Sequence, residues 1–239
     1  LTRRHEVLRT AFPAEGGEPA QVVAERLSPP LTETDLRKLP ESARGAAALR
    51  LCGEDKRRPF DLASGPLLRC LLLRLRDDEV LIFLTFHHTV FDGWSIGLLR
   101  RDLTALLYAA ETGEAADLPP LPIQYADFAA WQRRRLDDRR LDELLGYWRE
   151  RMKGAPPAIG LPFDHPRPAV ATNEGARRRF ALPAELTEAL RDLGARCGTT
   201  PFMTMLAVFA ALLHRWSGER DMVLGTPVAN RARPELDHL

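Results

Sequence analysis

The pattern of apolar positions divides the chain into strand-like and helix-like stretches. Two runs, 67–75 and 79–87, are apolar at most positions and flank a polar turn at 76–78. They predict a pair of neighbouring strands. The second run is apolar at nearly every position, so we expect a central strand that is covered on both faces. After it, apolar residues recur at helical spacing from Ile96 to Ala110 and end before Gly113, which predicts an amphipathic helix.

Weaker patterns predict the remaining elements, which alternate between helix and strand. Helices are expected at 41–57, 125–135, 140–153, 183–195 and 201–216, with the tail of an incomplete helix at 3–12; strands are expected at 19–24, 177–182 and 222–228. A proline-rich stretch, 154–168, is the most convincing linker. We therefore expect a first lobe over 1–160, a linker over 161–168 and the start of a second lobe over 169–239.

Composition narrows the classes of function. The 239 residues are 45% hydrophobic, enough for a sizeable core, and the net charge of +1 supplies no polybasic field for nucleic acid or an anionic membrane. No apolar run approaches the roughly 20 residues of a membrane span. Three widely separated cysteines, Cys52, Cys70 and Cys197, indicate a reducing cytoplasm rather than a disulfide framework. The chain begins with leucine and stops after a strand-like segment, so we expect a fragment cut at both ends.

Candidate chemistry is concentrated between the apolar run and the amphipathic helix, in His87-His88-Thr89-Val90-Phe91-Asp92-Gly93. Histidine, with an ordinary pKa of about 6.5, exchanges protons near neutral pH. Enzymes built on sheets often place their chemistry at strand ends. If the strand continues this far, the two histidines point to opposite faces. The arrangement is typical of an acyl-transfer site.

Two simpler readings apply to the histidine pair. A metal site needs several ligands that converge on one point. Adjacent histidines on a strand diverge, and no further cluster of metal-ligating residues lies nearby in the sequence. We therefore expect no metal. A buried, hydrogen-bonded structural histidine remains the preferred reading for His87.

A serine esterase is a competing reading of the same region. Residues 93–97 read Gly-Trp-Ser-Ile-Gly and match the nucleophile elbow G-x-S-x-G. An elbow joins its strand directly to the serine turn, whereas residues 89–92 intervene here. Ser95 is also a natural N-cap for the following helix. Downstream of it, His165, His214 and His238 have no distinctive context, so the esterase stays a minor alternative.

Five segments, in the same order, resemble the condensation domains of nonribosomal peptide synthetases, which belong to the chloramphenicol acetyltransferase-like superfamily. They are RHEVLRTAF at 4–12, FDLASGPLLR at 60–69, HHTVFDG at 87–93, YADFAAW at 125–131 and GTPVANR at 225–231. The third matches the family pattern H-H-x-x-x-D-G. The resemblance implies an α/β fold, an α+β two-layer sandwich with its first lobe nearly complete and its second lobe truncated.

The resemblance also implies an activity and its partners. The amine of an aminoacyl thioester on one carrier protein attacks an acyl or peptidyl thioester on another, forming a peptide bond. Each carrier holds its cargo on a 4′-phosphopantetheine arm, so the chain itself needs no cofactor. The implied partners are an upstream donor carrier, a downstream acceptor carrier and an adjoining adenylation domain.

The subtype is less sharply indicated. The Asp-Gly-Trp-Ser run and the helix after it look most like domains that join an L-donor to an L-acceptor. Phe86 and Phe91 depart from the residues that are usual at their positions. Epimerisation domains share the histidine motif and are the nearest alternative. A coenzyme A-dependent acyltransferase and a noncatalytic carrier-binding fragment also remain open.

Within this family, His88 is expected to act on the attacking amine, as a base or as a hydrogen-bonding positioner. Gly93 is expected to leave room for substrate and to offer its backbone N–H to the oxyanion. Asp92 is expected to be a structural fastener, because a buried carboxylate needs a cation or several donors. By family analogy that cation is Arg231.

Other motif residues are expected to support the site. His87, Trp94 and Ser95 frame the motif, and Arg4 and Arg9 tie the first helix to the core, with ordinary ion pairs as an equally good reading. Tyr125, Asp127 and Trp131 are expected to pack rather than to contact substrate.

Overall fold

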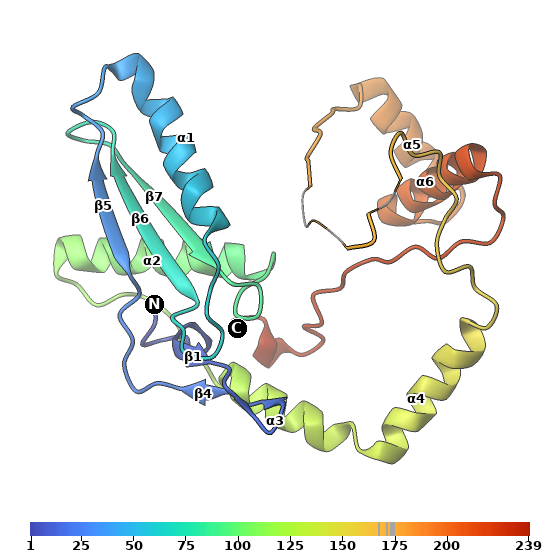
Figure 1. The fold of residues 1–239 in the computed structure, drawn as a ribbon, viewed down its shortest axis with the longest axis horizontal. Helices are drawn as coiled ribbons and strands as arrows, with labels where there is room; N and C mark the ends of the chain where they lie inside the picture. The colour runs from blue at the N-terminus through green and yellow to red at the C-terminus, as the bar shows by residue number, and fades with distance from the viewer. Residues whose placement is uncertain (167, 171, 173–174) are drawn as a thin grey trace. The chain divides into compact units, whose positions relative to one another are not determined.

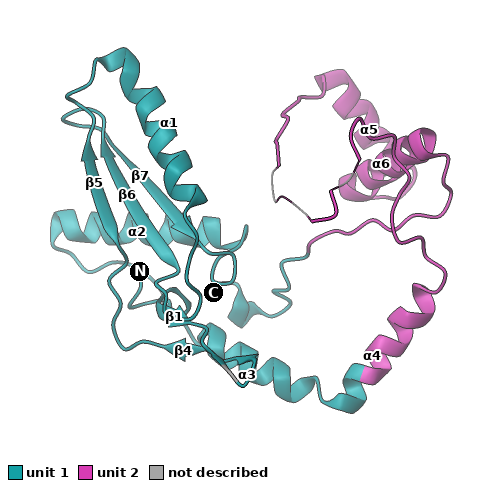
Figure 2. Cartoon of the chain, viewed as in Figure 1, with its two compact units in different colours: residues 1–141, 228–239 teal, residues 142–227 magenta. Residues whose placement is uncertain are grey.

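The computed structural model describes residues 1–166, 168–170, 172 and 175–239, which form two compact units. Unit 1 contains residues 1–141 and 228–239, and unit 2 contains residues 142–227 (Figure 2). These units are defined by contacts within each of them. The lobes expected at 1–160 and 169–239, with a linker at 161–168, stay a prediction about domain organisation.

Unit 1 is built on a three-stranded sheet of β5 (Leu31–Asp35), β6 (Leu68–Arg74) and β7 (Val80–Phe86). β5 runs parallel to β6, and β6 pairs antiparallel with β7 in a register that sets Leu68 opposite Phe86 (Figure 1). The predicted strand pair is therefore confirmed. The expectation that its second strand is central is wrong: within the described chain β6 is central, β7 lies at the edge, and residues 80–82 are exposed. A continuous apolar run does not reveal which strand has two neighbours.

Helix α1 (Glu41–Arg57) packs on this sheet and closes a small core. The core combines Leu36, Ala48, Leu71 and Leu73, with partly buried side chains such as Phe83 around it. Burial of this kind stabilises the fold by roughly 25 cal/mol per Å² of apolar surface. In Figure 1, α1 lies along the sheet, and α2 (Ser95–Thr112) crosses behind the strands.

The helices predicted at 41–57, 96–110 and 125–135 are confirmed as α1, α2 and α3 (Tyr125–Arg135). α2 ends where expected because Gly113, with φ of 79°, takes the left-handed conformation that terminates a helix. A short 3-10 helix, η2 (Pro234–Leu236), completes this unit near the C-terminus.

The N-terminal segment differs from its prediction. In place of a helix tail over 3–12 there is one 3-10 turn, η1 (Glu6–Arg9), followed by β1 (Thr10–Ala11). β1 pairs with β4 (Val22–Val23), while β2 (Ala14–Glu15) pairs with β3 (Glu18–Pro19). The single strand expected at 19–24 is thus split between β3 and β4. Pairing with a later segment ends the helical turn, and local periodicity does not contain that information.

Unit 2 contains most of α4 (Asp138–Arg151), together with α5 (Ala184–Arg196) and α6 (Pro201–Ser217). All three agree with the predicted helices to within two residues. α6 begins at Thr200, whose side-chain oxygen accepts a hydrogen bond from the Met203 N–H, and Pro201 occupies the first helical position. α5 and α6 approach closely at Gly194, where a Cβ would lie 2.8 Å from Thr204 Oγ1.

The two strands predicted in the second half of the chain are absent: residues 177–182 and 222–228 are irregular. Phe180 and Val228 within them are largely exposed. Their apolar composition favours a strand, but a strand forms only where a neighbour satisfies its backbone hydrogen bonds.

Among the described residues, no individual helix has both the length and the apolar character of a membrane span; α5 and α6 reach that threshold only as a pair bent by 105°.

The core of unit 1 yields a stability prediction. Leu73 is 0% exposed, so Leu73→Ala removes buried methyl groups and leaves a cavity. We expect a loss of about 2–5 kcal/mol in the free energy of unfolding, measured by urea denaturation. Leu49→Ala is the matched control, because Leu49 is 77% exposed on α1, and it is expected to change stability by less than about 0.5 kcal/mol. Equal effects of the two substitutions would contradict this core.

Candidate active site

The histidine motif forms the connection between β7 and α2. The strand ends at Phe86, and one more ladder bond follows, from the His87 N–H to the Leu67 carbonyl at 3.0 Å. The chain then turns, with the Val90 N–H donating to the His87 carbonyl at 3.1 Å. The rings of Phe86 and Phe91 stack at a centroid distance of 4.0 Å and an interplanar angle of 11°. The two residues that depart from the usual family pattern therefore pack against each other.

The two histidines have different surroundings. His87 Nδ1 lies 2.9 Å from Thr89 Oγ1, and its ring meets the Phe60 ring edge-on at 6.0 Å. His88 is exposed and lines a cavity of about 190 Å³. The strand ends before both histidines, so the condition for placing them on opposite faces is not met. His87 is partly buried and has a side-chain partner, whereas His88 is exposed.

The cavity lies entirely within unit 1, and its wall is mostly apolar. Its residues come from the N-terminal segment, the motif connection, α2, α3 and the C-terminal segment. Leu8, Leu99 and Phe128 belong to the apolar wall, while His5 and His88 add imidazole groups. A mostly apolar cavity with a few polar groups is typical of a small-molecule site.

Asp92 fastens this connection to the C-terminal segment. Arg231 Nη1 lies 2.7 Å from Asp92 Oδ2, and Nη2 lies 3.4 Å from Oδ1, so the partner named from family analogy is the one present. Asp92 Oδ1 also accepts hydrogen bonds from the Ser95 N–H at 3.0 Å and from the Ser95 hydroxyl at 2.7 Å. Burial opposes ionisation of Asp92, but hydrogen bonds from Arg231 and Ser95 outweigh it and lower its pKa to about 2.

Ser95 is not the N-cap that the sequence suggested. Trp94 occupies that position, Ser95 is the first residue of α2, and the carboxylate that accepts the Ser95 N–H belongs to Asp92. Because the Ser95 hydroxyl donates to Asp92, its described partner is an acid rather than a histidine base. This geometry is that of a helix start and differs from a nucleophile elbow.

Gly93 and Trp94 complete the motif on its outer side. Both are exposed, and in the described chain neither belongs to the cavity wall. A Cβ on Gly93 would meet no atom within 4 Å, so internal packing does not require glycine there. The Trp94 indole N–H donates to the Asp237 carbonyl at 3.2 Å, and the Arg231 guanidinium lies 5.8 Å from its ring centre. Trp94 thus reinforces the Asp92–Arg231 pair.

Arg4 anchors the N-terminal segment to α2 as expected. Its Nε donates to Asp102 Oδ2 at 2.8 Å, and Asp102 is 0% exposed. Arg9 does not reach this core: its Nη2 donates to Glu6 Oε1 at 2.9 Å, and its Nη1 donates to the Ala24 carbonyl. Arg9 therefore joins η1 to the segment after β4.

Two residues that sequence reasoning passed over, His5 and Asp102, meet at this point. His5 Nε2 lies 2.8 Å from Asp102 Oδ2, and Arg101 Nε donates to Oδ1 at 2.8 Å. Burial alone would raise the pKa of Asp102, but hydrogen bonds from His5, Arg101 and Arg4 hold it below its ordinary value. A signal was present, since Asp102 is an acid among the apolar positions of α2.

The residues expected from α3 divide between packing and the cavity. Asp127 Oδ2 accepts the Gln124 N–H at 2.8 Å in a capping box, and Trp131 stacks on Phe128 at 5.8 Å, so both have packing roles. Tyr125 lines the cavity, contrary to a role in packing alone. Gln124, also passed over, accepts the Glu6 N–H at 3.1 Å and donates to the Arg4 carbonyl.

In the part of the chain that the structure describes, no group of three or more His, Cys, Asp or Glu side chains could hold a metal ion. The site is instead a cavity lined by the exposed imidazole of His88, next to the turn that the Asp92–Arg231 ion pair holds.

Comparison with known proteins decides the family. The model of the condensation domain family matches residues 1–239. This chain belongs to the condensation domain family. The resemblance found in five sequence segments is therefore confirmed.

Several relatives are large synthetases. The condensation domain is 84% identical over 239 residues to phosphinothricin tripeptide synthetase PhsC of Streptomyces viridochromogenes, of which it covers 22%. It is 41% identical over 240 residues to malpibaldin synthetase of Mortierella alpina, of which it covers 4%. In both cases all of this chain is matched, so it spans only a small part of the curated relatives.

Solved structures confirm the mixed α/β, chloramphenicol acetyltransferase-like fold. The four-domain nonribosomal peptide synthetase AB3403, bound to AMP and glycine, matches 99% of this chain with a TM-score of 0.82 and 29% identity, over 17% of its own length. SgcC5 of Streptomyces globisporus matches 99% with a TM-score of 0.75 and 33% identity. This chain covers 53% of SgcC5, as expected for a partial domain.

The lowered pKa of Asp92 predicts how stability depends on pH. A carboxylate whose folded-state pKa is about 2, below its ordinary 3.8, adds stability above pH 4 and loses it as the pH falls towards 2. Because Asp92 is 33% exposed, solvent screening reduces this contribution to on the order of 1–2 kcal/mol. We expect Asp92→Asn to be less stable than the parent at pH 6, with the difference shrinking between pH 4 and 2.

Chemical denaturation of both proteins across this pH range measures the difference directly. Asp164→Asn, a change at an exposed acid of unit 2, is the control and is expected to show no such convergence. A difference between the parent and Asp92→Asn that stays constant from pH 6 to 2 would contradict the ion pair.

Proposed function

We propose that this chain forms part of a nonribosomal peptide synthetase condensation domain in which His88 promotes peptide-bond formation. The substrates are an aminoacyl thioester and an acyl or peptidyl thioester, each carried by a protein on a 4′-phosphopantetheine arm. The observation that carries the proposal is the exposed imidazole of His88 on the wall of a mostly apolar cavity.

The proposed reaction forms one bond and breaks one. The acceptor amine attacks the carbonyl carbon of the donor thioester, a tetrahedral intermediate collapses, and the C–S bond breaks to release the donor arm as a thiol. The amine loses a proton, and the thiolate gains one. His88 assists at the amine, either by taking its proton or by accepting a hydrogen bond that orients its lone pair.

Typical rate contributions indicate whether proton transfer by His88 or positioning of the two substrates is the larger effect. A free α-amine has a pKa near 7.7–8.0, so most of it is protonated at neutral pH and cannot attack. General base catalysis typically contributes about 10²–10⁴-fold. Holding two reactants in attack geometry can contribute roughly 7–11 kcal/mol. Since a thioester is already activated, positioning is the larger part of this proposal.

The Asp92–Arg231 pair supports the proposal by fixing the loop that carries His88. Arg231 spans from the C-terminal segment to the motif, and Asp92 also holds the start of α2 through Ser95. Removing either partner would allow the connection to shift. In this role Asp92 positions His88 and does not touch the reacting atoms.

We also assign a substrate role to Gly93. A Cβ at this residue would meet no atom within 4 Å, so packing among the described residues does not require glycine there. We assign it space for the incoming arms, with its backbone N–H directed to the oxyanion of the tetrahedral intermediate.

The partners follow from the synthetase context. The relatives include a phosphinothricin tripeptide synthetase and a malpibaldin synthetase, and the domain of AB3403 belongs to a four-domain synthetase. The proposed partners are a donor carrier, an acceptor carrier and an adjoining adenylation domain. The cytoplasm is the proposed compartment, since Cys52, Cys70 and Cys197 are free thiols.

The main test is His88→Ala in a protein that carries the whole domain. We expect peptide-bond formation between loaded carriers to fall by about 10² or more, because either role of the imidazole is lost. The melting temperature should stay within about 2 °C, since His88 is exposed and has no hydrogen bond to the described residues.

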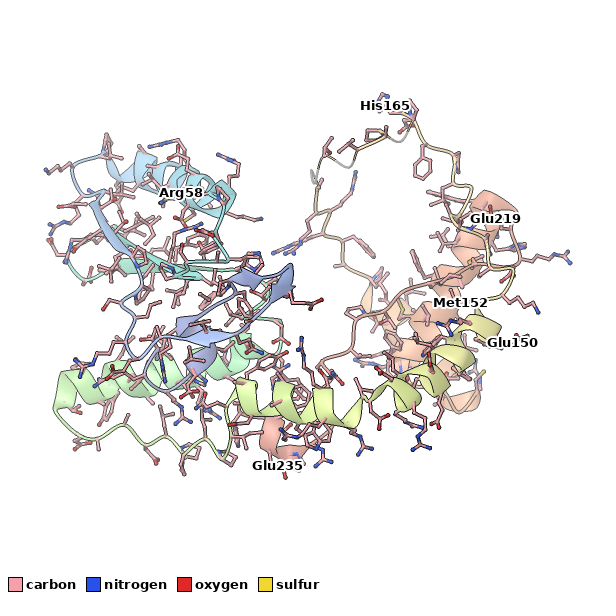
Figure 3. The ribbon with its side chains drawn as sticks, turned by 60° about the horizontal axis from the view of Figure 1, so that its bottom comes forward. Arg58, Glu150, Met152, His165, Glu219 and Glu235 are labelled. Carbon is pink, nitrogen blue, oxygen red and sulfur yellow. The ribbon has the colours of Figure 1, made fainter. Side chains whose placement is uncertain are left out.

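His165→Ala is the matched control, because it removes an exposed imidazole from the loop between α4 and α5 of unit 2 (Figure 3). It should leave both condensation and melting temperature unchanged. Near-normal condensation by the His88→Ala protein would overturn the assignment of His88.

The proposed subtype makes a separate prediction. A domain that joins an L-donor to an L-acceptor should form product from an L-configured donor at least about tenfold faster than from its D-epimer, a difference of about 1.4 kcal/mol in the barrier. Single-turnover assays with the two loaded donors measure this ratio. A ratio of one, or a preference for the D-donor, would remove the subtype while leaving the condensation activity in place.

A further inference from the structure

The second imidazole of the cavity, that of His5, is held by a buried carboxylate. Its Nε2 lies 2.8 Å from Asp102 Oδ2, and the two side chains are 12% and 0% exposed. Asp102 is also held by Arg4 and Arg101, so the carboxylate cannot turn away without losing these two partners as well. The ring of His5 is thereby fixed in orientation.

The protonation state of His5 follows from this contact. Asp102 is ionised and can only accept hydrogen bonds, so Nε2 carries the hydrogen that it donates. Burial lowers the pKa of His5 despite the hydrogen bond to Asp102, so the imidazole is neutral at neutral pH. A neutral imidazole with hydrogen on Nε2 has its lone pair on Nδ1.

Nδ1 is therefore an acceptor, and in the described chain it has no hydrogen-bond partner. His5 lines the same cavity as His88, and that cavity lies within unit 1. Here Nε2 is committed to Asp102, so Nδ1 is the ring nitrogen of this cavity-lining residue that has no partner among the described residues.

We propose that His5 is a substrate-binding residue: fixed by Asp102, it presents Nδ1 as an acceptor to an N–H group of the acceptor substrate. This inference rests on the proposed condensation function and adds a second contact to it. Two N–H groups share the required chemistry, the attacking amine and the amides of the carrier's pantetheine arm.

The neighbouring residues support an acceptor at this point. Gln124 caps α3 and uses its side chain on the backbone of the N-terminal segment, at Glu6 and Arg4. Asp92 is occupied by Arg231 and Ser95. These cavity-lining groups are already paired within the protein, whereas His5 Nδ1 is not.

The test compares two substitutions of His5 in a protein that carries the whole domain. Glutamine places an amide N–H near the position of Nε2, so His5→Gln retains the bond to Asp102 and loses the acceptor at Nδ1. Asparagine places an amide oxygen near the position of Nδ1, so His5→Asn retains an acceptor and loses the bond to Asp102. His165→Gln is the matched control outside the cavity.

For His5→Gln we expect the KM of the acceptor substrate to rise about tenfold, with the donor KM and the melting temperature unchanged. For His5→Asn we expect a lower melting temperature and an acceptor KM within about threefold of the parent. If His5 served only to hold Asp102, the acceptor KM would rank the other way: it would rise in His5→Asn and stay unchanged in His5→Gln. An unchanged acceptor KM in His5→Gln, or equal rises for donor and acceptor, would overturn the proposal.

If His5→Gln yields no folded protein, His5→Asn decides: a retained acceptor KM supports the proposal, and a tenfold rise overturns it. The two N–H sources are separated by comparing an aminoacyl pantetheine thioester with an aminoacyl ethanethiol thioester, which has no arm amide. A penalty that persists with the ethanethiol substrate identifies the amine as partner, and one that disappears identifies the arm. Loss of condensation in the parent itself would refute the proposed function rather than the role of His5.

Discussion

The geometry of the site depends on one partly buried ion pair, between Asp92 and Arg231. These residues are 139 positions apart, and their contact at 2.7 Å joins the loop after β7 to the C-terminal segment of unit 1. The same carboxylate holds the first N–H of α2. One side chain therefore fixes three pieces of backbone.

A second carboxylate, Asp102, holds the N-terminal segment against α2, as Asp92 holds the motif loop against the C-terminal segment. It is fully buried and accepts hydrogen bonds from Arg4, His5 and Arg101. A charge without solvent is costly unless several donors surround it, so the three donors are a condition for placing an acid on the inner face of α2. Asp102 holds His5 directly, whereas Asp92 holds the loop that carries His88.

The two histidines of the motif differ in their surroundings because the strand ladder ends between them. His87 continues the strand ladder through its backbone and packs its ring against Phe60. His88 follows the point where the ladder stops, and there the side chain is free to enter the cavity. The stacked rings of Phe86 and Phe91 close the base of the same turn. Phe91 itself lines the cavity together with His88, so the stack is part of the cavity wall.

The sequence by itself determined whatever depends on local order. Periodicity and end signals predicted α1, α2, α3 and the strand pair β6–β7, and the motif residues indicated the family. Only the tertiary structure decided which strand is central, that 177–182 and 222–228 remain irregular, and that His5 and Asp102 meet at the cavity. The reason is that each of these depends on partners distant in sequence. A strand needs a neighbour, and a buried acid needs donors from other elements, and neither requirement is visible in the spacing of residues along one segment.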